Sequence, residues 1–123
     1  MTSKEMMGLA VKILDSKKAE NIEVLKVDDV TILADYFVIA SGTNSTQVKA
    51  LAEEIDYRFS KRGMEPHHTE GRGSTWILMD YSSVIVHVFY KDTREFYALE
   101  RLWTDAQKLD INEVLEAAPV LEE

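Results

Sequence analysis

Apolar side chains recur at helical spacing near the start of this chain. The expected buried face consists of Met6, Leu9, Ala10, Ile13 and Leu14. Steps of three and four residues place these side chains on one side of a helix. Thr2 followed by Glu5 has the spacing of a capping box, and basic residues at 17–18 suit the negative end of the helix dipole. The pattern therefore predicts a first helix that ends near residue 17.

A second pattern joins a strand to a helix through a glycine turn. Residues 36–41 form a near-continuous apolar run, which is typical of a central strand covered on both faces. Gly42 begins the turn, and Asn44 is placed to cap the next helix with Gln47 at its third position. The apolar stripe expected on that helix is Val48, Leu51, Ala52, Ile55 and Phe59. Gly63 is expected to end the helix in a left-handed conformation.

Three further apolar segments predict strands. Residues 23–27 indicate a short strand, with the following Asp-Asp pair as a turn. Residues 76–81 and 84–91 indicate a hairpin around two serines, although the usual Asn-Gly turn is absent. Residues 64–75 contain a proline and two glycines and are expected to form a loop.

The last third of the chain is expected to be helical in two parts. Residues 92–109 have apolar positions at helical spacing, and a short helix is expected around Val114 before Pro119 interrupts it. Residues 110–123 carry five acidic and no basic side chains. The sequence thus predicts a single α/β (α+β) domain over 1–109, with a mixed β-sheet flanked by helices, and an acidic C-terminal extension over 110–123.

Composition narrows the classes of function. A length of 123 residues suits one domain. The absence of cysteine excludes disulfides, thiolate metal sites and cysteine nucleophiles. The N-terminus lacks the blocks of a signal peptide and no apolar run is long enough to span a membrane, so a cytoplasmic location is expected. A net charge of −8 argues against independent nucleic-acid binding, because a phosphate backbone requires a basic face.

The strand, glycine turn and helix around Gly42 resemble the arrangement that holds phosphates in nucleotide-transferring enzymes. Backbone amides of residues 41–45 would face such a group at the helix N-terminus. Metal-assisted phosphoryl transfer also needs carboxylates that clamp the cations. The later strands supply Asp80 and His87 where more acids are needed. Nucleotide binding is therefore an alternative, and hydrogen-bonding or interface roles for Asp80 and His87 are favoured.

Two other groups of side chains are candidate sites. His67 and His68 are adjacent and would point apart in an extended segment, so a metal site with His87 is not expected. Trp76 and Trp103 are either core residues or interface anchors, because tryptophan is enriched at binding hot spots. Strand alternation places Trp76, Leu78 and Asp80 on one side and Ile77, Met79 and Tyr81 on the other. An unpaired Asp80 is costly to bury, which favours a partly open Trp76 face.

The chain resembles the ribosomal silencing factor (Iojap-like) family in five segments that occur in the same order: DYFVIASGT at 35–43, EG at 70–71, WILMDY at 76–81, VIVHVF at 84–89 and REFYALERLW at 94–103. The resemblance implies a nucleotidyltransferase-like fold without the catalytic carboxylates. It also implies binding to the large ribosomal subunit through its fourteenth protein. Such binding blocks joining of the small subunit and represses translation under nutrient limitation.

Carried onto this sequence, the resemblance implies a partner-binding surface made by Glu70, Trp76, Asp80, Tyr81, His87, Phe89, Tyr97, Glu100 and Trp103. It implies no catalytic, cofactor-binding or metal-binding residue, and no enzymatic activity. Family crystals often contain two-fold dimers, so a homodimer is expected as a second interaction. The alternatives are a nucleotide-binding or residual nucleotidyltransferase domain, and a factor for assembly of the large subunit.

Overall fold

The computed structural model describes residues 1–71, 75–92 and 104–121 of the chain. Its elements, in chain order, are α1 (Ser3–Ser16), β1 (Glu20–Lys26), β2 (Tyr36–Gly42), α2 (Ser45–Lys61), β3 (His68–Glu70), β4 (Trp76–Asp80), β5 (Val84–Tyr90), β6 (Gln107–Lys108) and α5 (Ile111–Ala117). None of the helices in these ranges is long and apolar enough to cross a membrane.

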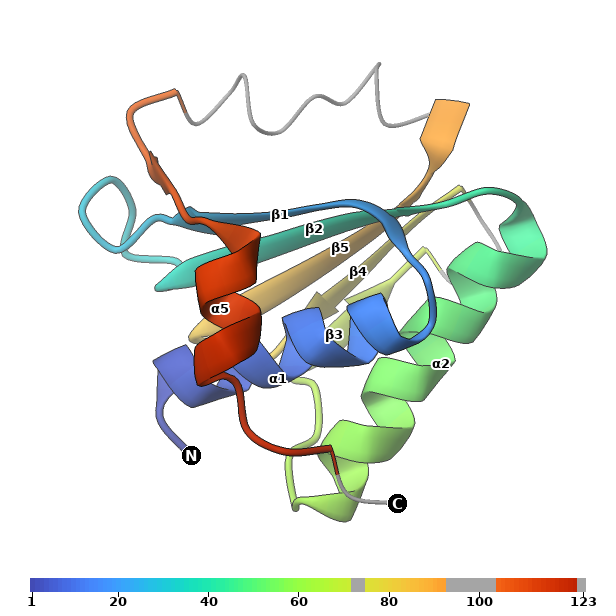
Figure 1. The fold of residues 1–123 in the computed structure, drawn as a ribbon, viewed down its shortest axis with the longest axis horizontal. Helices are drawn as coiled ribbons and strands as arrows, with labels where there is room; N and C mark the ends of the chain where they lie inside the picture. Colours follow the sequence, from blue (N-terminus) through green and yellow to red (C-terminus); the bar gives the residue numbers. More distant parts are fainter. Residues whose placement is uncertain (72–74, 93–103, 122–123) are drawn as a thin grey trace.

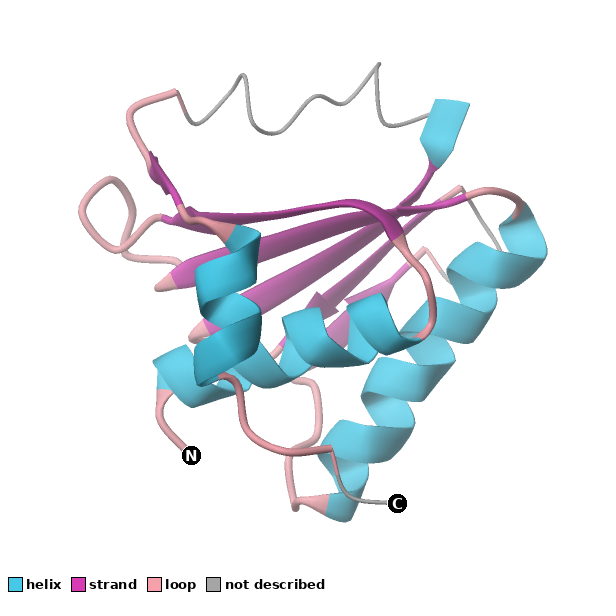
Figure 2. Ribbon diagram, in the orientation of Figure 1, coloured by secondary structure: helices cyan, strands magenta, loops and turns pink. Residues whose placement is uncertain are grey.

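The strands form one sheet in the order β3-β4-β5-β2-β1-β6. β2 and β5 run parallel at its centre, and the other neighbours are antiparallel. The helices α1, α2 and α5 all lie on one side of the sheet (Figures 1 and 2). The predicted α+β class, with a mixed sheet flanked by helices, is confirmed.

Two apolar clusters lie on opposite faces of this sheet. The larger one joins the helices to the sheet and includes Leu9 and Ile13 from α1, Ile55 and Phe59 from α2, and Met79 from β4. The second is made by residues of β1, β2 and β5 and of the loop between β1 and β2: Leu25, Val27, Ala34, Phe37, Ile39, Ile85 and Phe89. All seven residues of β2 are buried, as expected of a central strand.

The predicted caps of both long helices are confirmed. Thr2 and Glu5 form a reciprocal capping box at the start of α1. The Asn44 side chain accepts a hydrogen bond from the Gln47 amide at 2.8 Å and begins α2. Gly63 follows α2 with a φ of +79°, the left-handed conformation expected after a helix.

Two segments differ from their sequence-based predictions. The expected loop at 64–75 contains β3, whose three polar side chains give no apolar strand signal but whose backbone pairs with β4. The helix predicted over 92–109 does not extend to its C-terminal end, because Gln107–Lys108 form β6 against Leu25 and Lys26 of β1. An edge strand with open backbone groups provides those partners. Residues 93–103 lie outside the described part.

α5 packs against α1 on the helix side of the sheet (Figure 1). A Cβ atom on Gly8 would lie 3.3 Å from both Cα and Cβ of Ala118, so the glycine permits the close approach. Val114 is 8% exposed and belongs to the larger apolar cluster. The predicted short helix before Pro119 is thus confirmed, while the proposed boundary between 109 and 110 stays a prediction.

Candidate functional site

The face of the sheet away from the helices carries a group of aromatic side chains. Trp76 pairs with Phe89, and Leu78 with His87, across the β4–β5 hairpin. Directly opposite residues of neighbouring strands project to the same side of a sheet. Phe37 of β2 joins them, since its ring contacts His87. We call this group the aromatic face and define it as Phe37, Trp76, Leu78, His87 and Phe89.

The rings of the aromatic face hold one another in place. Trp76 stacks on Phe89 with their centroids 4.9 Å apart and an interplanar angle of 23°. Phe37 meets the His87 ring edge-on at 5.3 Å. The indole Nε1–H of Trp76 donates a hydrogen bond to Nδ1 of His87 at 3.2 Å. The indole is therefore oriented before any partner arrives, which lowers the entropy cost of binding through it.

His87 is a neutral ring at ordinary pH. Its Nδ1 accepts a hydrogen bond from Trp76, so the neutral ring carries its proton on Nε2. Burial lowers the pKa of His87 to about 4, because the charged form would lose its hydration. Nε2 is buried, and none of the residues that the structure describes forms a hydrogen bond with it. The ring thus serves as an acceptor for Trp76.

Two acidic side chains lie at the β3–β4 edge of this same face. Glu70 pairs across the strands with Leu78, and its carboxylate is 2.7 Å from Nε2 of His68. Asp80 accepts a hydrogen bond from the Ser82 amide at 2.7 Å and so supports the hairpin turn, where Ser82 has a φ of +70°. Asp80 lies opposite Ile85 rather than His87. The two residues share a face, as considered from the sequence, without forming a hydrogen-bonded pair in the described structure.

The structure brings together five of the nine predicted partner-binding residues: Glu70, Trp76, Asp80, His87 and Phe89. Trp76 and Asp80 are half-buried, whereas Ile77 and Met79 between them are buried, which confirms the partly open Trp76 face. Phe89 is 1% exposed and supports Trp76 from within. The interface role of these residues stays a prediction.

Of the other four predicted residues, Tyr81 is the one that the structure describes, and it lies away from this face. Tyr81 is 5% exposed and packs against Phe59 on the helix side, with ring centroids 4.6 Å apart. Strand alternation placed it there with Ile77 and Met79. Tyr97, Glu100 and Trp103 lie outside the described residues.

Sequence reasoning did not single out Phe37 as part of the site. The residue sits in a strand that is apolar at nearly every position, so no alternation shows which side chains share a face. Its pairing with Ile85 across the parallel strands fixes the side on which it lies. The available signal is only that an aromatic residue occurs at the second position of a central strand.

The glycine turn before α2 is accounted for by its own contacts. Gln47 Oε1 accepts hydrogen bonds from the Thr43 amide at 2.6 Å and from the Thr43 hydroxyl at 2.8 Å. A Cβ atom on Gly42 would lie 2.9 Å from Val48 in the first turn of the helix. Among the described residues, no group of three or more His, Asp or Glu side chains is placed to hold a metal ion.

The comparisons with known proteins agree with one another. A family model described as "Ribosomal silencing factor during starvation" matches residues 1–122. A "Ribosomal silencing factor RsfS" from Halalkalibacterium halodurans is 38% identical over 116 residues, covering 94% of this chain and 99% of the relative. A crystal structure of a protein from Chromobacterium violaceum superposes with a TM-score of 0.81 at 32% identity, covering 89% of this chain and 92% of that one.

A mouse relative carries a different name. The "Mitochondrial assembly of ribosomal large subunit protein 1" of Mus musculus is 33% identical over 102 residues. The match covers 80% of this chain and 45% of the mouse protein.

Proposed function

This chain belongs to the ribosomal silencing factor family, and from that premise we propose that it binds the large ribosomal subunit and keeps the small subunit from joining. The proposed contact is the fourteenth large-subunit ribosomal protein. The proposed result is lower translation when nutrients are scarce, and the proposed location is the cytoplasm. The whole chain is nearly coextensive with its bacterial relative, which supports transfer of the family role.

The observation that supports docking most directly is the aromatic face with its acidic edge. Trp76 offers a large half-buried surface that is already oriented by Phe89 and His87. Buried or half-buried tryptophans of this kind dominate the binding energy of many interfaces. Glu70 and Asp80 place negative charge beside it. This combination suits a partner surface with an apolar patch and basic side chains, and the net charge of −8 helps to steer the chain toward it.

The proposed mechanism needs no bond to be made or broken. A domain docked on the large subunit occupies space that the small subunit requires, so the two compete for one surface. Inhibition is then a matter of mass action, and its extent follows the affinity and the concentration of the factor.

Binding to purified large subunits tests this proposal. Trp76→Ala should weaken binding by about 30-fold or more, since hot-spot residues contribute about 2 kcal/mol or more. Tyr57→Ala is the matched control, because Tyr57 is an aromatic residue that is 58% exposed on α2, away from this face. Thermal melts must first show that both variants fold. Equal binding by the two variants would remove the aromatic face from the interface.

The charges of the acidic edge, Glu70 and Asp80, can be removed without removing the hydrogen bond that Asp80 makes in the hairpin turn. Asp80→Asn removes the charge but keeps an oxygen that can accept the Ser82 amide. Combined with Glu70→Gln, it should weaken binding most at low salt, because screening reduces the contribution of exposed charges. A loss of affinity that does not depend on salt would contradict an electrostatic role.

The second candidate function is assembly of the large subunit, which the name of the mouse relative favours. The two functions differ in what happens to mature subunits. A silencing factor should reduce joining of purified mature small and large subunits, and Trp76→Ala should restore it. An assembly factor should bind immature large particles and leave joining of mature subunits unchanged.

A further inference from the structure

The loop between β1 and β2 presents apolar side chains to solvent. Ile32 is fully exposed at 102%, Leu33 is 68% exposed and Val30 is 38% exposed. Among the described residues, six large hydrophobic side chains are exposed, and these three lie within one stretch of four residues. Single exposed apolar residues are ordinary on protein surfaces. Three together form a local apolar tip, which is typical of an interaction site.

This loop has a defined conformation. The Val27 amide donates to the Asp35 carbonyl at 2.8 Å and closes the base. The Val30 and Thr31 amides both donate to the Val27 carbonyl, at 3.0 and 2.9 Å. The Leu33 amide donates to the Thr31 hydroxyl at 3.1 Å. These bonds hold the apolar tip in place without contacts from Ile32, so little ordering is needed when a partner binds.

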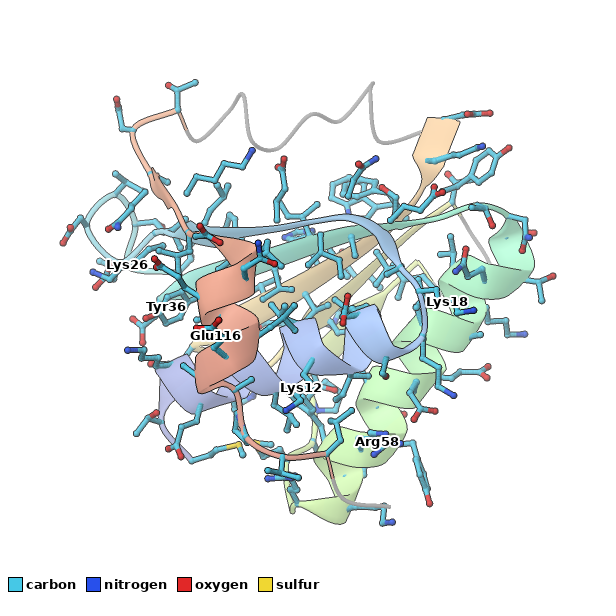
Figure 3. All side chains as sticks on the ribbon, viewed as in Figure 1. Lys12, Lys18, Lys26, Tyr36, Arg58 and Glu116 are labelled. Atoms are coloured by element: carbon cyan, nitrogen blue, oxygen red, sulfur yellow. The ribbon has the colours of Figure 1, made fainter. Side chains whose placement is uncertain are left out.

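The base of the loop is tied to the rest of the domain. Val27 and Ala34 are buried in the apolar cluster on the side of the sheet away from the helices, together with Phe37 and Phe89 of the aromatic face. Lys26 and Tyr36 pair across β1 and β2 next to this base (Figure 3). The loop extends beyond the ends of β1 and β2, on the side of the molecule opposite α2 (Figure 1). The base of the loop therefore packs in the same apolar cluster as Phe37 and Phe89 of the aromatic face.

The charges around the tip define what can bind to it. Asp28 and Asp29 are exposed at the start of the loop, and Asp35 follows at its end. Lys26, at the end of β1, is paired with Asp28 at 3.4 Å, and its hydrogen bond to Asp28 raises the pKa of the Lys26 ammonium. We call Asp28, Asp29 and Asp35 the acidic rim. Its negative charge repels a phosphate backbone and an anionic membrane. It also disfavours a second copy of a chain with net charge −8.

We propose that the β1–β2 loop is a second anchor on the large ribosomal subunit, with Ile32 and Leu33 inserted into an apolar pocket on a basic ribosomal protein. The proposal rests on the proposed function and adds a contact outside the predicted partner-binding residues. Ribosomal RNA is the other large surface available on that particle, and the acidic rim selects protein over RNA. Because the base of the loop and the aromatic face share one apolar cluster, they engage the subunit together.

The double variant Ile32→Ser/Leu33→Ser tests this anchor. The two side chains are exposed, so the melting temperature should stay within a few degrees of the wild type. Affinity for purified large subunits should fall by at least tenfold, which corresponds to about 1.4 kcal/mol. Val120→Ser is the matched control, because Val120 is an apolar residue that is 74% exposed far along the chain from this loop. Its affinity should stay within about twofold of the wild type.

The outcomes separate this inference from the proposed function. If the wild type binds and the double variant binds equally well, the loop is not an anchor and the proposed function stands. If the wild type does not bind at all, both are overturned. A photocrosslinking amino acid at position 32 identifies the occupant: a crosslink to a ribosomal protein supports the proposal, and a crosslink to ribosomal RNA overturns it. Position 120 provides the control for random crosslinking.

Discussion

Acidification should destabilise this protein through one buried ring, that of His87. Burial lowers the pKa of His87 to about 4 in the folded protein, whereas an unfolded chain has a histidine pKa of about 6.5. The unfolded state therefore binds the proton more readily than the folded state. The contribution of the neutral ring to the free energy of unfolding is fully present above pH 6.5 and is lost as the pH falls toward 4.

The size of this effect follows from the two pKa values. A pKa difference of about 2.5 corresponds to about 3 kcal/mol, reached once the pH is below about 4. About 2 kcal/mol of this should be lost between pH 7 and pH 5. Protonation also turns Nδ1 into a donor, so it can no longer accept the Trp76 indole hydrogen at 3.2 Å.

Denaturant unfolding at pH 7 and pH 5 measures the loss, with His87→Asn as the comparison. Asparagine places a neutral oxygen near the position of Nδ1 and does not titrate in this range. Other groups destabilise both proteins in acid, so the informative quantity is the difference between their pH dependences. The wild type should lose about 2 kcal/mol more than the variant. Equal losses, or a His87 ring that titrates near 6.5 by NMR, would refute the reasoning.

Two further predictions concern the turn before α2. Gly42→Ala should reduce the free energy of unfolding by about 1–3 kcal/mol, because its Cβ would lie 2.9 Å from Val48; chemical denaturation measures this, and an unchanged midpoint would contradict the close approach. Asn44→Ala should cost about 1 kcal/mol by removing the acceptor of the Gln47 amide, whereas Asn44→Asp should retain most of the stability; equal losses for both variants would argue against a capping role.

The parts of the fold that were predicted correctly have local signals. The capping box at Thr2 and the cap at Asn44 each depend on residues three positions apart. The stripe of α2 repeats at a fixed period, so its buried face could be read directly. In contrast, the pairing of β6 with β1 joins Lys108 to Leu25 across most of the chain. No local pattern encodes such a pairing.

For the candidate site too, the pattern within one strand could be predicted, whereas the pairing between strands could not. Alternation within one strand placed Trp76 with Asp80 and Tyr81 on the other side, as the structure confirms. The register that adds His87 and Phe89 to the face could not be fixed, because a one-residue slip reverses the sides of a strand. The exposure of Ile32 was also unpredictable: apolar residues are normally buried, and only the fold determines which loop projects into solvent.

The central parallel pair has a consequence for synthesis of the chain. β2 and β5 pair through Tyr36 and Val84, which are separated by 48 positions (84 minus 36). β1 and β2 can form a hairpin early in translation, but the middle of the sheet waits until β5 has left the exit tunnel. Trp76 lies in β4, which is made before β5, and Phe89 lies in β5 itself. A nascent copy therefore lacks the aromatic face, and with it the proposed binding surface, until β5 has been made.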